Sequence, residues 1–386
     1  MFNVKLFNKI SKTGVSALTP DKYLLSEELE NYDAVLVRSA KLHETEFPAD
    51  CKCIARAGAG VNNIPIDRCT KQGIVVFNTP GANANAVKEL VVAGLLLASR
   101  KISDSIAWAN TLENNDETEA VIEKGKSSFV GPEIYGKKLG VIGLGAIGVM
   151  VANVAHDLGM QVCGYDPYLS VNAAWGLSRK IEKAASNDEI FATCDYITIH
   201  VPQNDSTKGM INAESIAKMK DGVRILNFSR GGLVNSADMK AALESGKIAS
   251  YVTDFPAGLI GVKNVVAIPH LGASTPESEE NCAVMASVEL RDYLEDGNIK
   301  NSVNFPTVNV PRSGGTRVCL IHANVPNIIS QISSTLAAKG INIEHMSNMS
   351  RGDIAYTIID IDSDVDEGVV EAIKAIPQII RVRVIK

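Results

Sequence analysis

The sequence contains no long apolar run and no leader-like start. Among its 386 residues the longest unbroken apolar stretch is Leu90–Ala98, which includes a glycine, whereas a membrane-spanning helix needs roughly 18–20 residues. We therefore expect no transmembrane helix. The opening residues, Met1–Phe7, resemble a β-strand and lack the charged-then-apolar order of a signal peptide. These absences predict a cytoplasmic protein.

The sequence also lacks a basic block and has few cysteines. Its 38 basic and 44 acidic residues give a net charge of −6, so neither nucleic acid nor an anionic membrane is expected as a partner. Seven cysteines indicate reduced thiols rather than a disulfide scaffold. Cys51 and Cys53 form a C-x-C pair, but no second Cys or His pair lies at zinc spacing, so no metal site is predicted.

What is present is the pattern of a multidomain α/β protein. The length predicts two or three domains, and 46% hydrophobic with 21% charged residues is ordinary for globular chains. Apolar strands alternate with helices, which predicts a doubly wound parallel sheet covered on both faces. The apolar helix predicted over 84–99 should be buried between layers. Residues 296–315 are rich in Asn, Pro and Gly and indicate a linker, after which a β-α-β-β-α-β order predicts a ferredoxin-like unit.

The strongest local motif is a glycine-rich turn between a strand and a helix. Gly143, Gly145 and Gly148 follow the apolar strand 138–142, and Asp166 ends the next strand 18 residues after Gly148. Such glycines permit a tight turn, close approach of the backbone to a pyrophosphate, and close packing of helix on sheet. Asp166 would bind the ribose hydroxyls and repel a 2′-phosphate. The motif therefore predicts binding of NAD rather than NADP.

Three segments together carry a resemblance to a known family. They are the motif Gly143–Gly148 with Asp166, the segment Asn227–Val234 and the segment Pro269–Thr275. With them the chain resembles the D-isomer-specific 2-hydroxyacid dehydrogenases, and within that family the enzymes that act on 3-phospho-D-glycerate. The resemblance implies a Rossmann-type doubly wound parallel sheet inserted in a flavodoxin-like substrate domain, followed by a ferredoxin-like βαββαβ ACT domain.

The resemblance also implies domain limits. The substrate domain is expected to be discontinuous, with the active site in the cleft that it forms with the nucleotide domain. The expected limits are 1–92 and 272–300 for the substrate domain, 93–271 for the NAD-binding domain, 301–315 for the linker and 316–386 for the ACT domain.

Two side chains are expected to carry the chemistry. Arg230 follows a predicted buried strand, and its planar guanidinium suits bidentate contact with a carboxylate. By resemblance it orients the substrate, the alternative being a salt bridge within the protein. His270 follows Pro269 at the end of the last predicted strand. A single histidine is more often structural, but the resemblance assigns it the exchange of the hydroxyl proton.

The family pattern also contains a glutamate that hydrogen-bonds this histidine, and the present chain departs from it. The best alignment places Gly258 where that acid should be, and no Asp or Glu occurs between Ala257 and Pro269. We expect His270 to act without this partner or with an acid from elsewhere in the cleft. His200 also ends a strand, and a structural role is expected for it.

The resemblance supplies the remaining cofactor and substrate contacts. In this chain Ala146 stands where relatives often have arginine, so more of the phosphate contact would fall to the backbone. Arg38 and Arg56 are the cations expected to bind a substrate phosphate. The further cofactor contacts implied are Ala146, Ile147, Val201, Pro202, Phe228, Ser229, Asp254, Gly272 and Ala273. The further substrate contacts implied are Ser39, Asn83 and Asn85.

The C-terminal unit is expected to sense a small molecule. By resemblance, His322, Asn324 and Asn342 would hold an amino-acid effector, L-serine, across an interface between domains. Asn327 replaces a glycine often found in relatives, which leaves the effector open. The alternative is a domain that only promotes oligomerisation, and a homodimer or homotetramer is expected in either case.

The resemblance thus implies NAD-dependent oxidation of 3-phospho-D-glycerate to 3-phosphohydroxypyruvate, the first step of L-serine biosynthesis. One alternative is a dehydrogenase of another 2-hydroxy acid, such as glycerate or 2-hydroxyglutarate. The other is a catalytically inactive regulator that binds NAD and an amino acid, which only the missing glutamate suggests.

Overall fold

The computed structural model describes residues 1–11, 13–313 and 315–386, which form two compact units. The central unit is Asn83–Thr275, and the terminal unit combines Met1–Ala82 with Pro276–Lys386. The expected domain limit at 92/93 falls inside helix α2 (Ala84–Ser99), a continuous helix that belongs to the central unit as a whole.

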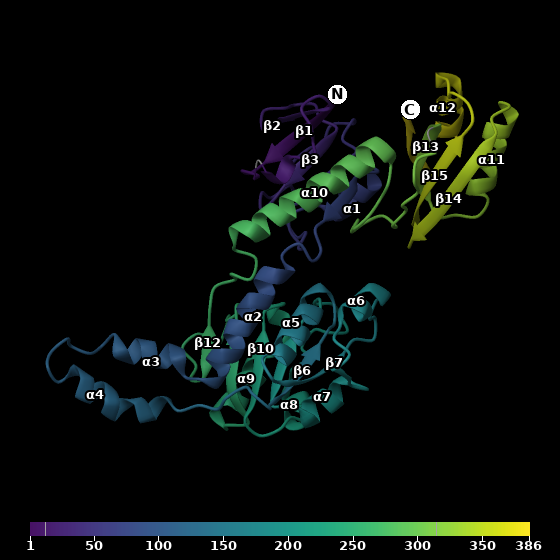
Figure 1. Ribbon diagram of the computed structural model, residues 1–386. Helices are drawn as coiled ribbons and strands as arrows, with labels where there is room; N and C mark the ends of the chain where they lie inside the picture. The colour runs from purple at the N-terminus through teal and green to yellow at the C-terminus, as the bar shows by residue number, and fades with distance from the viewer. Residues whose placement is uncertain (12, 314) are drawn as a thin grey trace. The chain divides into compact units, whose positions relative to one another are not determined.

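The central unit is built on one parallel sheet of seven strands (Figure 1). The strand order is β12-β11-β10-β9-β6-β7-β8. The chain adds β7 and β8 on one side of β6 and β9 to β12 on the other, as in doubly wound nucleotide-binding folds. This confirms the doubly wound prediction. The strands are β6 (Lys138–Ile142), β7 (Gln161–Tyr165), β8 (Glu182–Lys183), β9 (Tyr196–Ile199), β10 (Val223–Asn227), β11 (Ile248–Thr253) and β12 (Val265–Ala267).

Helices cover this sheet because its strands are apolar on both faces. On one face α2 packs against α5, β10 and β11, and on the other α7 and α9 pack against the strands. Gly94 allows the approach of α2, because a Cβ there would lie 2.9 Å from the Phe228 ring. The helices are α3 (Ile102–Ala109), α4 (Thr118–Gly125), α5 (Ala146–Asp157), α6 (Val171–Gly176), α7 (Asn187–Thr193), α8 (Ala213–Ala217) and α9 (Ser236–Glu244).

The terminal unit begins with a parallel five-stranded sheet in the order β2-β1-β3-β4-β5, the flavodoxin-like order. Its strands are β1 (Phe2–Phe7), β2 (Tyr23–Ser26), β3 (Ala34–Val37), β4 (Cys53–Arg56) and β5 (Val75–Asn78), with helices α1 (Ile66–Lys71) and α10 (Pro276–Asp296). The long helix α10 buries Cys282, Ala286 and Leu290 against this sheet. Among the described helices, none combines the length and apolar character that crossing a bilayer requires.

The last part of the terminal unit is the expected ferredoxin-like domain. Its antiparallel sheet has the order β14-β15-β13-β16, and side chains alternate between two faces as the pleat requires. Val318 and Leu320 pack under the two helices, whereas Cys319 and Ile321 face the core that contains α10. The elements are β13 (Thr316–Ala323), α11 (Ile328–Ala338), β14 (Ile343–Arg351), β15 (Ile354–Ile361), α12 (Glu367–Lys374) and β16 (Ile379–Ile385).

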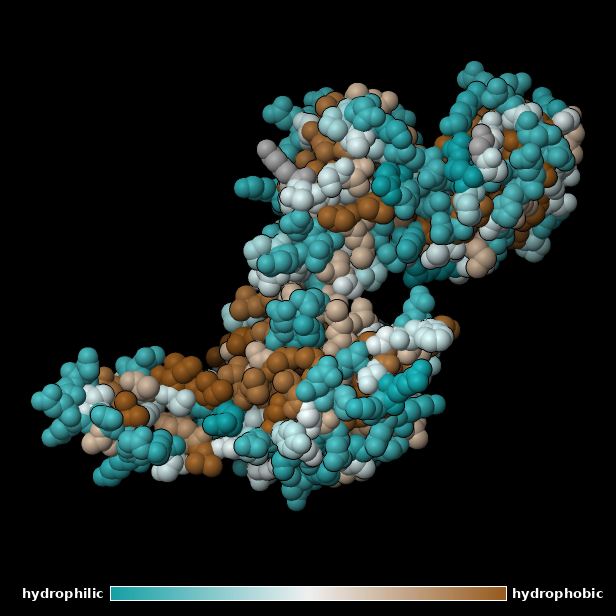
Figure 2. Space-filling view, in the orientation of Figure 1, coloured by the Kyte–Doolittle hydropathy of each residue, from teal (hydrophilic) through white to brown (hydrophobic). Residues whose placement is uncertain are grey.

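One apolar surface of the central unit remains uncovered in the single chain. The stretch 110–126, which has little pattern in the sequence, contains helix α4, and α3 and α4 bury none of their residues. Figure 2 shows apolar side chains gathered over α2 and α3. Leu96 of α2 is 42% exposed and Ile106 of α3 is 56% exposed, so the expected burial of α2 on most sides is only partly realised.

Candidate active site

The predicted site residues of the central unit follow the carboxyl ends of its parallel strands, where ligands of such folds bind. Gly143 follows β6 and Asp166 follows β7. Arg230, Asp254 and His270 follow the neighbouring strands β10, β11 and β12. The structure therefore places the cofactor motif and the expected chemical groups along one edge of one sheet.

The glycine turn has the shape that a dinucleotide needs. Gly143 has a φ of 89°, and a Cβ there would lie 2.5 Å from the His200 carbonyl oxygen. A Cβ at Gly148 would lie 2.0 Å from the Gly143 oxygen, whereas the space next to Gly145 is open. Helix α5 begins after Gly145 without a side-chain cap, so its first N–H groups face that space. Backbone N–H groups at a helix start suit a pyrophosphate.

The acid at the end of β7 is held in place by the same turn. One carboxylate oxygen of Asp166 accepts a hydrogen bond from the Leu144 N–H and the other accepts one from the Tyr168 N–H, both at 2.8 Å. A carboxylate oxygen has two lone pairs, so capacity remains for ribose hydroxyls. Ala146 and Ile147 form the first turn of α5, and Val201 and Pro202 follow β9. These positions fit NAD.

His200, for which a structural role is expected, directly follows strand β9 and lies beside Thr198. It is partly buried, its Nδ1 is enclosed, and its Nε2 lies 2.9 Å from the Thr198 hydroxyl. Burial lowers the pKa of its imidazole to about 4, which keeps the ring uncharged at neutral pH. A ring enclosed in this way cannot serve as the exposed base.

Asp254 links the expected catalytic groups electrostatically. It is 3% exposed, and among the described residues neither of its carboxylate oxygens has a partner in hydrogen-bond geometry. Burial raises the pKa of Asp254, while the charge of His270, the backbone N–H groups of Asp254 and Gly272, and the charge of Arg230 act to lower it. The three groups therefore share one electrostatic environment. A buried carboxylate is costly unless its hydrogen bonds are complete, and the nearby N–H groups of Asp254 and Gly272 do not reach it in full hydrogen-bond geometry, so it keeps capacity for a ligand donor.

Arg230 and His270 are both exposed. The Arg230 guanidinium donates to the Ser229 carbonyl oxygen at 2.6 Å, which leaves donors for a substrate carboxylate. Phe228 is buried and Ser229 donates to the Ile199 carbonyl oxygen, so the segment before Arg230 is rigid. Gly272 and Ala273 follow His270, and Gly272 is close to Asp254, because a Cβ there would lie 3.6 Å from the Asp254 Oδ2.

The expected partner of His270 is replaced by an aromatic ring that the sequence did not indicate. The centroids of the Phe255 and His270 rings are 4.6 Å apart. Gly258 has a φ of 80°, a conformation that costs a side-chain-bearing residue about 1–2 kcal/mol. The backbone is thus shaped for glycine at the position that the resemblance assigns to the family's acid. The position of Phe255 directly after Asp254 was the only sequence signal for its role.

The expected phosphate-binding residues meet at the strand ends of the terminal unit. Arg38 and Arg56 follow or end the paired strands β3 and β4, and the Arg56 guanidinium donates to the Arg38 carbonyl oxygen at 3.0 Å. Ser39 lies beside them, with its N–H bonded to Asn8. The guanidinium of Arg38 forms an ion pair with Glu279 of α10. A phosphate would therefore compete with Glu279 for Arg38.

Asn83 and Asn85 belong to the central unit, at the start of α2. The side chain of Asn85 donates to Glu89 at 2.9 Å, whereas that of Asn83 forms no cap bond with the helix. The structure therefore does not bring these two amides together with the arginines in one unit.

The expected effector residues differ in their availability. His322 is 1% exposed, and its ring nitrogens lie 2.8 Å from the Ala323 carbonyl oxygen and the Thr357 hydroxyl. Asn324 and Asn342 are exposed. Asn327, at the position where the resemblance leads us to expect glycine, adopts a φ of 68°, which asparagine tolerates better than most residues. The loop therefore keeps the conformation that glycine would give it.

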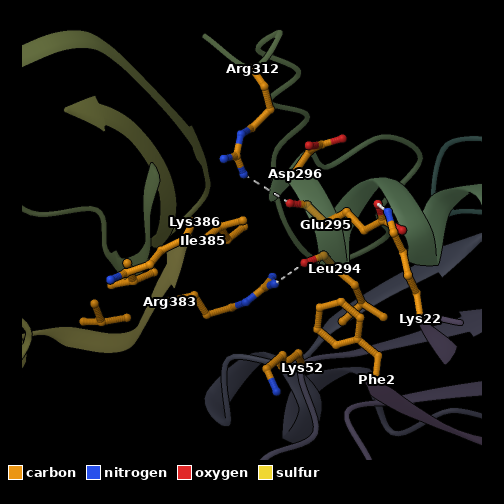
Figure 3. Close-up of a pocket in the computed structure, with 12 residues that line it drawn as sticks. Phe2, Lys22, Lys52, Leu294, Glu295, Asp296, Arg312, Arg383, Ile385 and Lys386 are labelled. Atoms are coloured by element: carbon orange, nitrogen blue, oxygen red, sulfur yellow. Dashed lines mark hydrogen bonds and ion pairs between the residues drawn. The ribbon is translucent and has the colours of Figure 1, made fainter. Parts of the chain in front are cut away.

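A cavity of about 620 Å³ lies where the ferredoxin-like domain meets the end of α10. Figure 3 shows Arg383 reaching from β16 to the Leu294 carbonyl oxygen and Arg312 reaching to that of Glu295. These arginines bond to the last carbonyl groups of α10, which need donors. The lysines of the cavity also have acidic partners, as in the pair of Lys22 with Glu295. Its cations thus stabilise the contact with the helix, and we assign no ligand to it.

Comparison with known proteins identifies the families that the chain matches. Residues 92–272 match the family model described as "D-isomer specific 2-hydroxyacid dehydrogenase, NAD binding domain", and residues 318–378 match the ACT domain. The D-3-phosphoglycerate dehydrogenase of Escherichia coli K12 is 34% identical over 349 residues, covering 87% of this chain and 80% of the relative. That of Synechocystis is 37% identical over 305 residues, covering 76% of this chain and 52% of the relative.

Solved structures show the same fold. An NAD+-bound 3-phosphoglycerate dehydrogenase of Entamoeba histolytica has a TM-score of 0.59 at 24% identity, covering 78% of this chain and 98% of its own. The apo D-mandelate dehydrogenase of Rhodotorula graminis has a TM-score of 0.67 at 25% identity, covering 81% and 99%. The match to curated relatives over most of the chain, together with the matching family model, shows that this chain belongs to the D-isomer-specific 2-hydroxyacid dehydrogenase family.

Proposed function

We propose that the protein oxidises 3-phospho-D-glycerate to 3-phosphohydroxypyruvate with NAD, the first step of L-serine biosynthesis. The single observation that carries the chemistry is the placement of Arg230, Asp254 and His270 after three neighbouring strands of the nucleotide-binding sheet. The choice of substrate is supported by relatives named D-3-phosphoglycerate dehydrogenase in several organisms.

In this proposal each residue has a defined task. Arg230 binds the substrate carboxylate with two parallel N–H donors and fixes C2 in position. His270, in its neutral form, accepts the proton of the C2 hydroxyl as the carbonyl forms. When bound, NAD accepts the hydride that leaves C2. Asp254 accepts a hydrogen bond from the nicotinamide side of the cofactor. In the reverse direction His270 returns the proton.

His270 works here without the family glutamate. The Phe255 ring contacts the imidazole, and the charge of Asp254 acts on it from nearby. The ring restricts the orientation of the histidine, and the Asp254 carboxyl group lies in the same electrostatic environment. We infer that these two neighbours replace the missing acid.

An assay of NADH formation tests the proposed reaction. The purified protein is supplied with NAD+ and, in separate reactions, 3-phospho-D-glycerate, D-glycerate, 2-hydroxyglutarate and D-lactate. The highest kcat/KM is expected for 3-phospho-D-glycerate. A higher value for another acid would identify a different dehydrogenase, and no turnover with any hydroxy acid would contradict the enzymatic reading.

Replacing Arg38 with alanine should weaken recognition of the phosphate. Loss of a hydrogen bond to a charged group corresponds to about a tenfold or larger rise in KM, and this rise is expected for 3-phospho-D-glycerate but not for D-glycerate. Steady-state assays with both substrates measure the difference. Equal changes for the two substrates would remove Arg38 from the phosphate site.

We propose that the ACT domain binds L-serine and that bound serine slows turnover. Asn324 and Asn342 offer exposed amide donors and acceptors suited to a zwitterion, whereas His322 would have to exchange its present partners. Added L-serine should lower the rate of the wild type, and Asn324→Ala should require several times more serine for the same inhibition. If serine changes neither the rate nor the melting temperature of the wild type, this regulation is refuted.

We also propose a homodimer or homotetramer in the cytoplasm. The uncovered apolar surface over α2 and α3 supports association, since exposed patches of this kind mark contact sites. All seven cysteines are free and buried, as is common in a reducing compartment. Sedimentation equilibrium measures the particle mass, and a monomer at micromolar concentration would contradict the oligomer.

A further inference from the structure

A second cavity of about 540 Å³ lies within the terminal unit, between α10 and the segment that follows it. One wall is apolar and is formed by Val284, Met285 and Val288 of α10. Apart from Gly81 and Ala82 the remaining lining residues are polar, and they include Glu289, Asp292, Lys300 and Asn301. The cavity belongs neither to the nucleotide edge nor to the ACT effector residues.

Glu289 is the unusual group in this cavity. The residue is only 5% exposed. Its Oε1 accepts a hydrogen bond from the Asn301 side chain at 2.7 Å. Its Oε2 is buried and has no hydrogen-bond partner among the residues that the structure describes. An amide oxygen could accept the hydrogen bond from Asn301 equally well. The second carboxylate oxygen, Oε2, therefore makes no contribution to this hydrogen bond, and we call it the surplus oxygen.

The surplus oxygen carries a cost in the free protein. Burial raises the pKa of Glu289 to about 8, and the charge of Asp292 acts in the same direction. The Asn301 hydrogen bond and the charge of Lys300 act in the opposite direction but do not cancel the effect of burial. A carboxyl group in such surroundings is stabilised when a cation or a donor reaches it.

We propose that this cavity binds a small molecule with a primary ammonium group on a short aliphatic chain, the ammonium being held by Glu289. The ammonium supplies the donor that Oε2 lacks, and the aliphatic chain lies against Val284, Met285 and Val288. Two sources share this chemistry. An alkylamine needs nothing more, whereas an α-amino acid adds a carboxylate that Lys300 can bind. The inference does not depend on which hydroxy acid the enzyme oxidises.

Calorimetric titration of the full chain tests the site with two probes, n-butylammonium and L-norvaline. Glu289→Gln keeps the acceptor for Asn301 and replaces the surplus oxygen by a neutral NH2 group, so it should keep the fold while it loses the ionisable group. Glu280→Gln changes the same charge on the same helix outside the cavity lining and serves as the matched control. The expected result is binding by the wild type and by Glu280→Gln, with affinity reduced about tenfold or more in Glu289→Gln.

Proton release gives a second readout that a structural role would not produce. Below pH 8 the ammonium must ionise Glu289, so binding should release a proton, and titrations in buffers of different ionisation enthalpy measure it. Binding of n-butylammonium alone would support the ammonium site and identify its ligand as an alkylamine. Binding of norvaline that is weakened by Lys300→Met would support the site and identify its ligand as an α-amino acid. If neither probe binds, or if Glu289→Gln binds both like the wild type, the proposal is overturned. Neither outcome bears on the dehydrogenase assay.

Discussion

His270→Asn is expected to lower kcat for 3-phospho-D-glycerate oxidation by about 10²–10⁴-fold, the usual contribution of a positioned general base. The imidazole is the only expected proton acceptor next to Arg230, and an asparagine amide of similar size cannot accept the hydroxyl proton. Because the side chain acts in the chemical step, KM should change far less than kcat. Steady-state NADH formation measures both constants.

The control for this variant is cofactor binding. His270 is exposed and forms no part of the glycine turn, so the affinity for NADH, followed by its fluorescence, should stay within a few-fold of the wild type. If the kcat of His270→Asn stays within a factor of about ten of the wild-type value, the rate contribution of His270 is smaller than that of a usual general base. The proton would then have to leave through another group.

Arg230→Met is expected to lower kcat/KM by about a hundredfold or more, since removal of a hydrogen-bonded charge partner costs about 2–5 kcal/mol. Methionine keeps the length of the side chain but removes every donor. The loss should appear in both kcat and KM, because the carboxylate is bound in the ground state and held in the transition state.

Arg230→Lys separates charge from geometry. Lysine keeps the positive charge but cannot form the two parallel hydrogen bonds of a guanidinium. Only part of the activity should return, and NADH affinity should be normal in both variants. If methionine at 230 supports nearly normal kcat/KM, the arginine does not bind the substrate carboxylate.

The fold followed from local signals in the sequence. Continuous apolar strands that alternate with helices predicted a parallel sheet, and the glycines at 143, 145 and 148 marked where its nucleotide edge lies. Asp166, Arg230, Asp254 and His270 could be placed on this edge because each follows the end of a strand within three residues. Strand and helix periods are local properties, so they can be recognised without knowing what packs against what.

The rest depended on contacts between distant parts of the chain. No sequence period shows that Phe255 touches His270, or that His322 is enclosed by its own sheet. Glu289 appears as one more acid on an amphipathic helix, and only the fold shows that its Oε2 is buried without a partner. The departure at Gly258 was visible in the sequence, but its positive φ was not.

The most direct test of the central claim is a crystal structure of the complex with NAD+ and 3-phospho-D-glycerate. The account predicts that the Arg230 guanidinium binds the substrate carboxylate and that an imidazole nitrogen of His270 lies within about 3.2 Å of the C2 hydroxyl oxygen. A substrate bound with its hydroxyl facing another group, while Arg230 and His270 remain in solvent, would contradict the account.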